Sequence, residues 1–171
     1  MSSLPAFEDL DALPVTFRTT VGEEHLDLNG HMNIAHYFAF GGRALWDRSR
    51  EDLAMPDSYI EDRDRTTFTA EQHLRYLGES TLGDEIAVPV VGGARGAKSR
   101  HLAALILNRT RGQLACVLES MLVHVDFSTR RPTSFPDDVA AAIDAAVAAD
   151  RTPWPLPISG AVAVRSPSDA G

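Results

Sequence analysis

The sequence has only one cysteine, Cys116, so no disulfide bond can form within the chain. It also has no apolar run that approaches the ~20 residues of a membrane-spanning helix. Its first residues, MSSLPAFEDLDALP, carry neither the basic nor the apolar segment of a secretory signal. These three absences predict a cytoplasmic protein that does not enter a membrane.

Positive charge is scarce as well. The chain has 16 lysines and arginines against 24 aspartates and glutamates, which gives a net charge of −8. Sequence-independent binding of nucleic acid requires an excess of cations, so this balance argues against it. A local basic patch could still bind one small anionic ligand.

The length and composition favour a single domain. A chain of 171 residues, 44% of them hydrophobic, is long enough to bury a core. We expect this domain over residues 15–150, after an N-terminal extension formed by residues 1–14. Residues 151–171 are rich in proline, serine and alanine, and this composition predicts a poorly ordered tail.

The clearest predicted element is a helix from Ile34 to about Glu51. Apolar residues recur there with helical spacing, and the stripe expected to face the core consists of Ile34, Tyr37, Phe38, Gly41 and Leu45. Asn33 stands directly before this stripe, where its side chain can cap the first turn. A second helix is expected over residues 137–150.

Five segments separated by turn residues are predicted to be strands: residues 15–25, 65–77, 84–93, 100–110 and 113–127. The last two are almost continuously apolar and should lie in the interior of the sheet. Pro89 favours an edge position or a bulge for the third segment. One long apolar helix followed by an antiparallel meander predicts an α+β fold in which the sheet covers the helix.

The segment HLDLNGHMNIAHY places several polar residues directly before the long helix. In an extended loop, alternate residues would point the same way, and these are Asp27, Asn29, His31 and Asn33. Alternatively, Asp27 and Asn29 form an Asx-turn, Gly30 supplies a special backbone angle, and the helix is merely capped. The first interpretation adds chemistry. Backbone N–H groups near Asn33 or Ile34 would polarise a thioester carbonyl, while the carboxylate activates water or attacks directly.

The stretch DLNGHMNIAHY, with the helix and meander after it, resembles the hotdog acyl-CoA thioesterases related to 4-hydroxybenzoyl-CoA thioesterase, over most of residues 15–127. Its Asp-x-Asn-x-His-x-Asn spacing is also similar to the active-site segment of plant acyl-ACP thioesterases. The resemblance implies a hotdog fold and a catalytic carboxylate at Asp27, with Asn29 and His31 orienting it and the attacking water. The substrate-binding candidates at the start of the helix are Asn33, Ile34 and Tyr37.

The same resemblance implies an assembly and a cofactor requirement. Hotdog relatives form two-fold dimers, often paired again into tetramers, so we expect a homodimer or homotetramer with each site built across an isologous interface. No metal or bound cofactor is expected, because CoA is part of the substrate.

Glu71, in the strand segment FTAEQHLRYL, is a second candidate for the catalytic carboxylate. Related thioesterases often carry a functional glutamate in this region. His73 shares its face of the strand and is a candidate acid/base partner that contacts substrate. Alternatively, both residues are ordinary polar groups on the strand surface.

The basic run GGARGAKSRH lies between two predicted strands. It is not a P-loop, because only three residues separate Gly92 from Gly96 and the context is a hairpin. The resemblance implies instead that cations of this hairpin contact the phosphates of CoA, and the candidates are Arg95, Lys98 and Arg100. A solvated turn is the alternative.

Other chemistries find little support. The sequence contains no G-x-S-x-G elbow of a serine hydrolase and no histidine or cysteine spacing typical of zinc. Cys116, Tyr37 and Trp46 are expected in the core, and His124 is expected to be a structural histidine with satisfied hydrogen bonds.

The sequence therefore predicts an acyl-CoA thioesterase. A non-catalytic acyl-CoA-binding module remains an alternative, as does a hotdog hydratase. The hydratase signature D-x-N-P-x-H fits poorly, since Gly30 replaces its proline and His31 comes one residue too soon. The acyl group stays open, although the MLVHVD strand end is similar to that of thioesterases linked to carnitine and betaine metabolism. An aromatic box of Tyr37, Phe40 or Trp46 could bind a trimethylammonium group.

Overall fold

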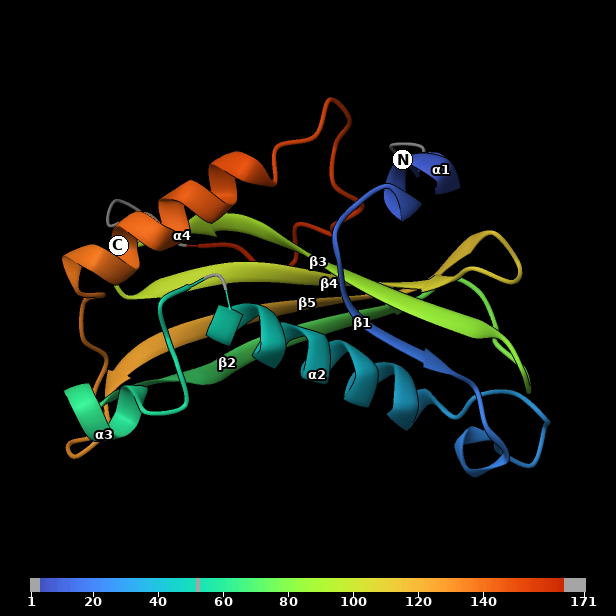
Figure 1. Ribbon diagram of the computed structural model, residues 1–171, viewed down its shortest axis with the longest axis horizontal. Helices are drawn as coiled ribbons and strands as arrows, with labels where there is room; N and C mark the ends of the chain where they lie inside the picture. Colours follow the sequence, from blue (N-terminus) through green and yellow to red (C-terminus); the bar gives the residue numbers. More distant parts are fainter. Residues whose placement is uncertain (1–3, 52, 165–171) are drawn as a thin grey trace.

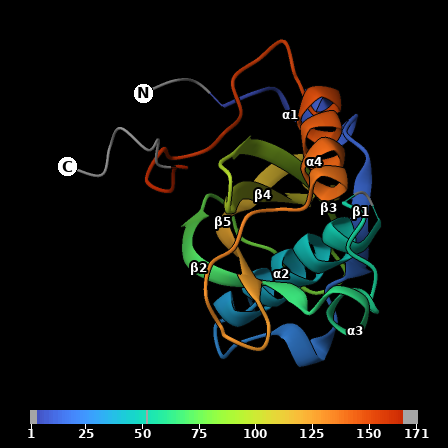
Figure 2. The ribbon, with the colours of Figure 1, turned by 90° about the vertical axis from the view of Figure 1, so that its left-hand side faces the viewer.

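The computed structural model describes residues 4–51 and 53–164, which form a five-stranded antiparallel sheet with the strand order β1-β3-β4-β5-β2. The strands are β1 (Val15–Thr20), β2 (Arg65–Tyr76), β3 (Glu85–Arg95), β4 (Ser99–Asn108) and β5 (Gln113–Asp126). The helices are α1 (Phe7–Asp11), α2 (Ile34–Glu51), α3 (Tyr59–Arg63) and α4 (Asp137–Ala149), with a 3-10 turn over Glu23–His25. The sheet curves around α2 (Figures 1 and 2), which confirms the predicted α+β hotdog arrangement.

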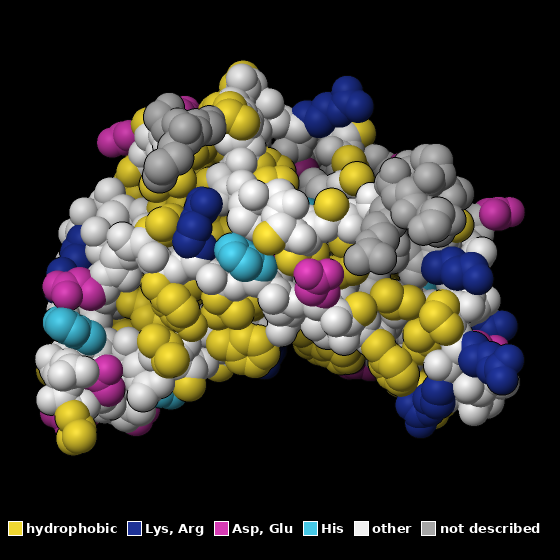
Figure 3. Space-filling model, turned by 180° about the vertical axis from the view of Figure 1, so that it is seen from behind, with side chains coloured by type: hydrophobic (Ala, Val, Ile, Leu, Met, Phe, Trp, Pro, Cys, Tyr) yellow, Lys and Arg dark blue, Asp and Glu magenta, His cyan; other side chains and the backbone are white. Residues whose placement is uncertain are grey.

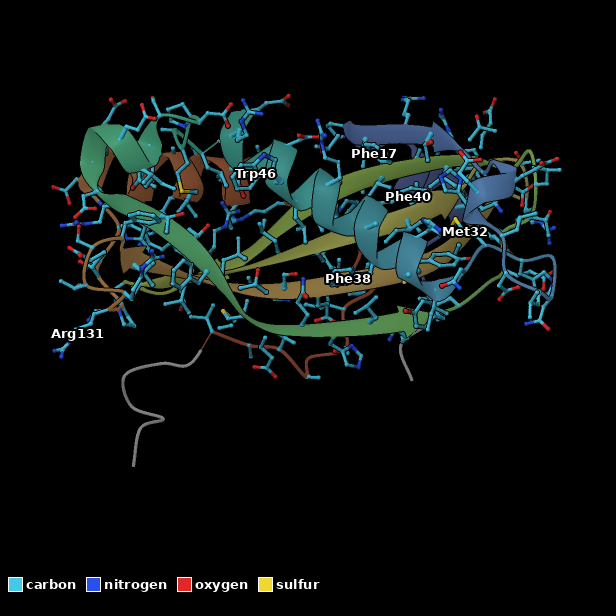
Figure 4. The ribbon with its side chains drawn as sticks, turned by 90° about the horizontal axis from the view of Figure 1, so that it is seen from below. Phe17, Met32, Phe38, Phe40, Trp46 and Arg131 are labelled. Atoms are coloured by element: carbon cyan, nitrogen blue, oxygen red, sulfur yellow. The ribbon has the colours of Figure 1, made fainter. Side chains whose placement is uncertain are left out.

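Helix α2 has the predicted bounds, and its inner face packs against the concave side of the sheet. The buried apolar residues of this face are Tyr37, Phe40, Gly41, Ala44 and Leu45. Gly41 lies at the closest approach, since a Cβ there would come within 2.7 Å of the Leu118 side chain. The prediction that Ile34 and Phe38 face the core is wrong, because they are 64% and 46% exposed. Phe38 lies on the side of α2 nearest β2, at the edge of the sheet, where the sheet no longer covers the helix (Figure 4).

The interior strands match the sequence, and the first strand is shorter than expected. β4 is the central strand and β5 lies beside it, so both are interior as predicted. β1 ends at Thr20 rather than residue 25. Pro89 is on an interior strand, so the predicted edge position is wrong. The predicted bulge does occur there, in the partner strand, between Val15 and Phe17.

The tail is packed rather than poorly ordered over its described part. Trp154, Leu156 and Ile158 contact a second core cluster on the face of the sheet opposite α2, and Leu10 of α1 is buried in the same cluster. The prediction of a poorly ordered tail is therefore wrong for residues 152–164. Residues 165–171 of the predicted tail lie outside the described residues. The outer face of β4 and β5 is apolar, and covering it removes that surface from water.

A third cluster joins the segment after α2, α3, Phe135 and α4, and His124 of β5 contacts it through Tyr59 and Phe135. His124 is completely buried there, with Nε2 2.9 Å from the Tyr59 hydroxyl and Nδ1 3.1 Å from the Thr133 carbonyl oxygen. It is thus the satisfied structural histidine that was predicted. Cys116 is buried in the main core, where burial raises the pKa of its thiol to about 12. The expectation that Trp46 is a core residue is wrong, since it is 55% exposed.

No helix within the described residues is long and apolar enough to cross a membrane.

Candidate active site

Asp27 begins a tight turn at the end of the sheet where α2 starts. Its Oδ1 accepts hydrogen bonds from the backbone N–H of Asn29 at 2.8 Å and of His31 at 3.4 Å. Gly30 has a φ of 76°, a conformation that other residues rarely adopt. The Asx-turn interpretation is therefore confirmed, and the extended loop with four parallel side chains is wrong. The hydrogen bond from Asn29 is the main reason why the pKa of Asp27 is lowered, so its carboxylate is ionised at neutral pH.

The turn is joined firmly to the start of α2. Asp27 and His31 also pair through their backbones, with the Asp27 N–H 2.8 Å from the His31 carbonyl oxygen. The side chain of Asn33 accepts a hydrogen bond from the Ala35 N–H at 2.9 Å, so it caps α2 as predicted. The Asn33 N–H is already bonded to a carbonyl oxygen, that of His25, at 2.9 Å. The N–H of Ile34 has no acceptor among the described residues and remains open at the helix N-terminus.

The neighbouring segment 79–84 supports the turn from one side. His31 forms a β-bridge with Thr81, and the Met32 N–H donates to the Ser80 carbonyl oxygen at 2.7 Å. The His31 imidazole contacts Glu79: its Nε2 lies 3.1 Å from Oε2 of Glu79.

Asp84 is the buried centre of this support. Its Oδ2 accepts hydrogen bonds from the Thr81 N–H at 2.9 Å, from the Asn108 amide at 2.8 Å and from Nε of Arg111 at 2.9 Å. Burial raises the pKa of Asp84, but these hydrogen bonds and the charge of Arg111 outweigh it, so the pKa is lowered. Asn108 also donates to the Ser80 hydroxyl at 3.1 Å. A network of buried polar groups therefore fixes the backbone that contacts the Asp27 turn.

Tyr37 lies one turn inside α2 and is almost fully buried. Its hydroxyl donates to the Gly78 carbonyl oxygen at 3.3 Å, and its ring packs edge-on against Tyr76 at the end of β2. Burial raises the pKa of the Tyr37 hydroxyl. Tyr37 thus joins α2 to the turn after β2, and its ring is a core group, as the sequence suggested.

The structure does not bring Glu71 to Asp27. Glu71 is exposed and pairs with Met121 beside a bulge in β2. His73 shares its face and lies 3.6 Å from the buried carboxylate of Glu119, to which the Ser159 N–H of the tail donates. Glu71 and His73 therefore belong to the sheet face under the tail, whereas α2 packs on the other face.

The three hairpin cations have three different environments. Arg95 pairs with Asp144 of α4, and Lys98 is exposed with its Nζ 3.5 Å from the Pro132 carbonyl oxygen. Arg100 is only 1% exposed, on the face of β4 that points to the interior. This burial argues against a contact between Arg100 and phosphate, while Lys98 is accessible. The hairpin and the Asp27 turn lie at opposite ends of the sheet (Figure 1).

Sequence reasoning missed Glu79, Asp84 and Arg111. They occur in segments that were treated only as turns between strands. A signal was available, because the antiparallel pairing of β3 with β4 puts the start of β3 beside Asn108 and the hairpin after it. Asp84 and Arg111 flank those two strand ends and could have been paired from their opposite charges.

A groove of about 210 Å³ lies between α2 and β2, and its lining includes Trp46, Thr67, Thr69 and Gln72. Of the three aromatic residues considered for a trimethylammonium box, only Trp46 exposes its ring, since Tyr37 and Phe40 are buried. Within the described residues, no group of three or more histidine, cysteine or acidic side chains could bind a metal ion.

The chain matches the model of the thioesterase-like superfamily over residues 21–143. It is 28% identical to a betainyl-CoA thioesterase from Pseudomonas aeruginosa over 142 residues, which are 83% of this chain and 88% of that protein. It is 30% identical over 161 residues to an L-carnitine dehydrogenase/betainyl-CoA thioesterase from Ruegeria pomeroyi, covering 94% of this chain and 32% of that protein. The chain thus spans about a third of the length of this larger relative.

A solved structure of a hypothetical protein from Staphylococcus aureus, in complex with CoA, has a TM-score of 0.78 and 25% identity. The match covers 91% of this chain and 97% of that protein.

Proposed function

Because the chain belongs to the thioesterase-like superfamily, we propose that it is an acyl-CoA thioesterase, which hydrolyses a CoA thioester to a carboxylic acid and free CoA. The observation that carries this proposal is the ionised carboxylate of Asp27, fixed by two backbone N–H groups next to the N-terminus of a capped helix. Such a preorganised group loses little free energy to reorientation when the reaction begins.

In the proposed reaction Asp27 takes a proton from water, and the resulting hydroxide adds to the thioester carbonyl carbon. The carbonyl oxygen becomes an oxyanion, which the open N–H of Ile34 stabilises together with the partial positive charge of the helix N-terminus. The carbon–sulfur bond then breaks, and the CoA thiolate receives the proton from Asp27. Asn29 fixes the carboxylate. Water and substrate suffice, so the proposed reaction uses no bound cofactor.

Hydrolysis of a panel of acyl-CoA thioesters, followed with a thiol reagent that detects free CoA, tests the activity. We expect turnover of at least one short-chain, long-chain, aromatic or quaternary-ammonium substrate. Tight binding of acyl-CoA with no turnover of any of them would instead identify a non-catalytic binding module. Formation of a 3-hydroxyacyl-CoA from crotonyl-CoA would identify a hydratase.

For the acyl group we propose betainyl, a small acid that carries a trimethylammonium cation. Both relatives described above are named as betainyl-CoA thioesterases, and the match to the Pseudomonas aeruginosa protein covers most of both chains.

A charge-neutral substrate of the same shape separates recognition of the cation from recognition of size. In 3,3-dimethylbutyryl-CoA a carbon atom replaces the nitrogen of betainyl-CoA. We expect kcat/KM to be at least tenfold higher for betainyl-CoA. Equal values for the two substrates would contradict betainyl specificity and leave the thioesterase activity standing.

We propose further that the active unit is a two-fold dimer formed along β2. One edge of β2 pairs with β5, and the other has no partner strand among the described residues. Beside it, Ile34, Phe38 and Trp46 expose apolar side chains along one side of α2. Figure 3 shows apolar side chains gathered along the lower rim, at the height of α2 and β2 in Figure 1. Burial of this surface against a second copy would stabilise the pair.

Such a dimer would complete the site. Antiparallel pairing of two β2 strands places the start of one β2 beside the end of the other. The hairpin end of one subunit, with the exposed Lys98, would then lie next to the Asp27 turn of its partner. This arrangement lets one CoA thioester contact both groups.

Light scattering and subunit exchange test the assembly. We expect Phe38→Asp to yield inactive monomers, while the control Leu4→Asp, at another exposed apolar residue, remains dimeric and active. Mixing Asp27→Asn with Lys98→Ala should form hybrid dimers in which one of the two sites carries both wild-type groups, so turnover with the wild-type KM should return. A fully active monomer of about the 18.6 kDa chain mass would contradict the dimer.

A further inference from the structure

Four side chains form a row that starts at His31, beside the Asp27 turn, and ends at the buried Asp84. Nε2 of His31 lies 3.1 Å from Oε2 of Glu79, and Oε1 of Glu79 lies 3.0 Å from Nη1 of Arg111. Nε of Arg111 lies 2.9 Å from Oδ2 of the buried Asp84. Both carboxylate oxygens of Glu79 are therefore engaged, one by the imidazole and one by the guanidinium.

Glu79 is half-exposed, but its position is fixed by more than this pair of contacts. Its backbone carbonyl oxygen accepts a hydrogen bond from the Gln113 side chain at 2.9 Å. Arg111 is fixed in turn, since its Nη2 donates to the Thr81 hydroxyl at 2.7 Å while Nε contacts Asp84. An isolated surface ion pair contributes little, whereas a carboxylate anchored by a guanidinium that is itself anchored has a defined orientation.

The carboxylate of Glu79 beside Nε2 favours one of the two neutral tautomers of His31. A neutral imidazole has one N–H and one acceptor nitrogen, and a carboxylate partner selects the N–H that points to it. At His31 this is Nε2, which leaves Nδ1 as the acceptor. Among the described residues Nδ1 has no hydrogen-bond partner, so it is open to a hydrogen bond from a ligand or water.

We infer that Glu79 is a positioning residue, which holds the His31 imidazole in one orientation and one tautomer beside the Asp27 turn. The His31 backbone N–H donates to Asp27, so one residue links the carboxylate to an oriented imidazole. This inference rests on the proposed function, because the oriented Nδ1 acts on water or leaving group only in a hydrolase.

The first test replaces Glu79 by glutamine, which keeps the size of the side chain and removes its charge. We expect kcat for the best thioester to fall about tenfold with KM within twofold, because the orientation matters in the transition state and not for binding. Glu79→Asp, which withdraws the carboxylate by one methylene, should give an intermediate kcat. A raised KM with unchanged kcat would overturn the inference.

Glu24→Gln is the matched control. Glu24 also faces a histidine, with its Oε1 3.7 Å from Nε2 of His25, and it is 73% exposed. Since His25 accepts a hydrogen bond from the Gly22 N–H on its other nitrogen, its orientation does not depend on Glu24. We expect wild-type kcat and KM for this variant. A loss equal to that of Glu79→Gln would mean that any nearby negative charge has the same effect, which overturns the inference.

The second test does not require turnover. Imidazole ¹⁵N chemical shifts of His31 report its tautomer directly. We expect the Nε2–H form to predominate in the wild type and to lose its predominance in Glu79→Gln, whose amide can donate as well as accept. An unchanged tautomer would overturn the inference even if the protein is an active thioesterase. If instead the wild type hydrolyses no thioester but the tautomer changes, the proposed function fails and the contact between Glu79 and His31 stands.

Discussion

The regions around Asp27 and Glu71 each present a carboxylate, and they differ in how that carboxylate is held. Asp27 accepts hydrogen bonds from two backbone N–H groups of its own turn, beside the capped N-terminus of α2. Glu71 projects from an edge strand and is exposed, and its carboxylate has no hydrogen bond or ion pair among the described residues. A carboxylate in a fixed environment is ready to react, while a free one samples many rotamers.

For a catalytic role, the hydrogen bonds that hold a carboxylate in place are more important than the presence of the carboxylate itself. The Asp27 turn contacts segment 79–84, which in turn depends on Asp84, Asn108 and Arg111. Within the described residues, no hydrogen bond or ion pair joins the Glu71 carboxylate to such a layer. The proposed catalytic role therefore goes to Asp27. Four experiments test this difference between Asp27 and Glu71.

The largest effect is expected for Asp27→Asn. The amide keeps the shape of the side chain but cannot take a proton from water, so kcat should fall by about 10²-fold or more with KM within a few-fold. Steady-state kinetics on the best acyl-CoA measures both constants. A variant with near-normal kcat would reverse the comparison and move the role to another group.

A smaller effect, on stability, is expected for Asp84→Asn. The donors of Thr81, Asn108 and Arg111 would lose their charged acceptor at the buried Asp84 carboxylate, which should lower the free energy of unfolding by about 2 kcal/mol at pH 7. The folded-state pKa of Asp84 lies below 3.8, so this stabilisation is present above pH 3.8. It is lost as the pH falls through the lowered pKa.

Urea unfolding at pH 7 and at several values below pH 3.8 measures this loss. The difference in the free energy of unfolding between wild type and Asp84→Asn should become smaller at acid pH. The variant Glu85→Gln, at the neighbouring exposed residue, should unfold with the same free energy as wild type. A gap that does not change with pH would mean that shape rather than charge of Asp84 supports the turn.

A several-fold effect on binding is expected for Lys98→Ala. If the partner's hairpin approaches the Asp27 turn, Lys98 attracts the phosphates of CoA, and its loss should raise KM about three- to fivefold at low salt with kcat unchanged. The salt dependence of KM should flatten. Arg18→Ala, at the exposed edge strand β1, serves as the control of equal charge. An unchanged KM would contradict the proposed contact between Lys98 and the phosphates of CoA.

The smallest effect is expected for Glu71→Gln, whose kcat and KM should stay within about twofold of wild type. The side chain has no partner in the described structure whose loss would disturb the site. The same assay as for Asp27→Asn measures it, and the two variants together form the comparison. A loss of tenfold or more would show that the exposed carboxylate acts after all, for example by joining the site of a second subunit.

Much of the candidate site was predictable, because it depends on local chemistry. The Asx-turn at Asp27, the positive φ of Gly30 and the cap formed by Asn33 each involve residues within four positions of one another. The role of Glu79 was not predictable in this way. Glu79 follows His31 by 48 positions, and only the β-bridge between His31 and Thr81 places the two segments together.

Helix α2 with its bounds, the strand segments and the turn before the helix followed from the sequence, because periodicity and turn chemistry act between near neighbours. The predicted meander is wrong for β2, which pairs with β5 across the sheet rather than with β3. Tertiary structure decided which way the charged side chains point. Arg100 is buried and Glu71 lies on the face opposite α2 because of strand register, in which a shift of one residue would reverse each side chain. Trp154 and Leu10 cover the outer face of the sheet, although they come from opposite ends of the chain. An apolar surface can be packed only by segments that the fold brings to it, and their distance along the chain does not reveal the contact.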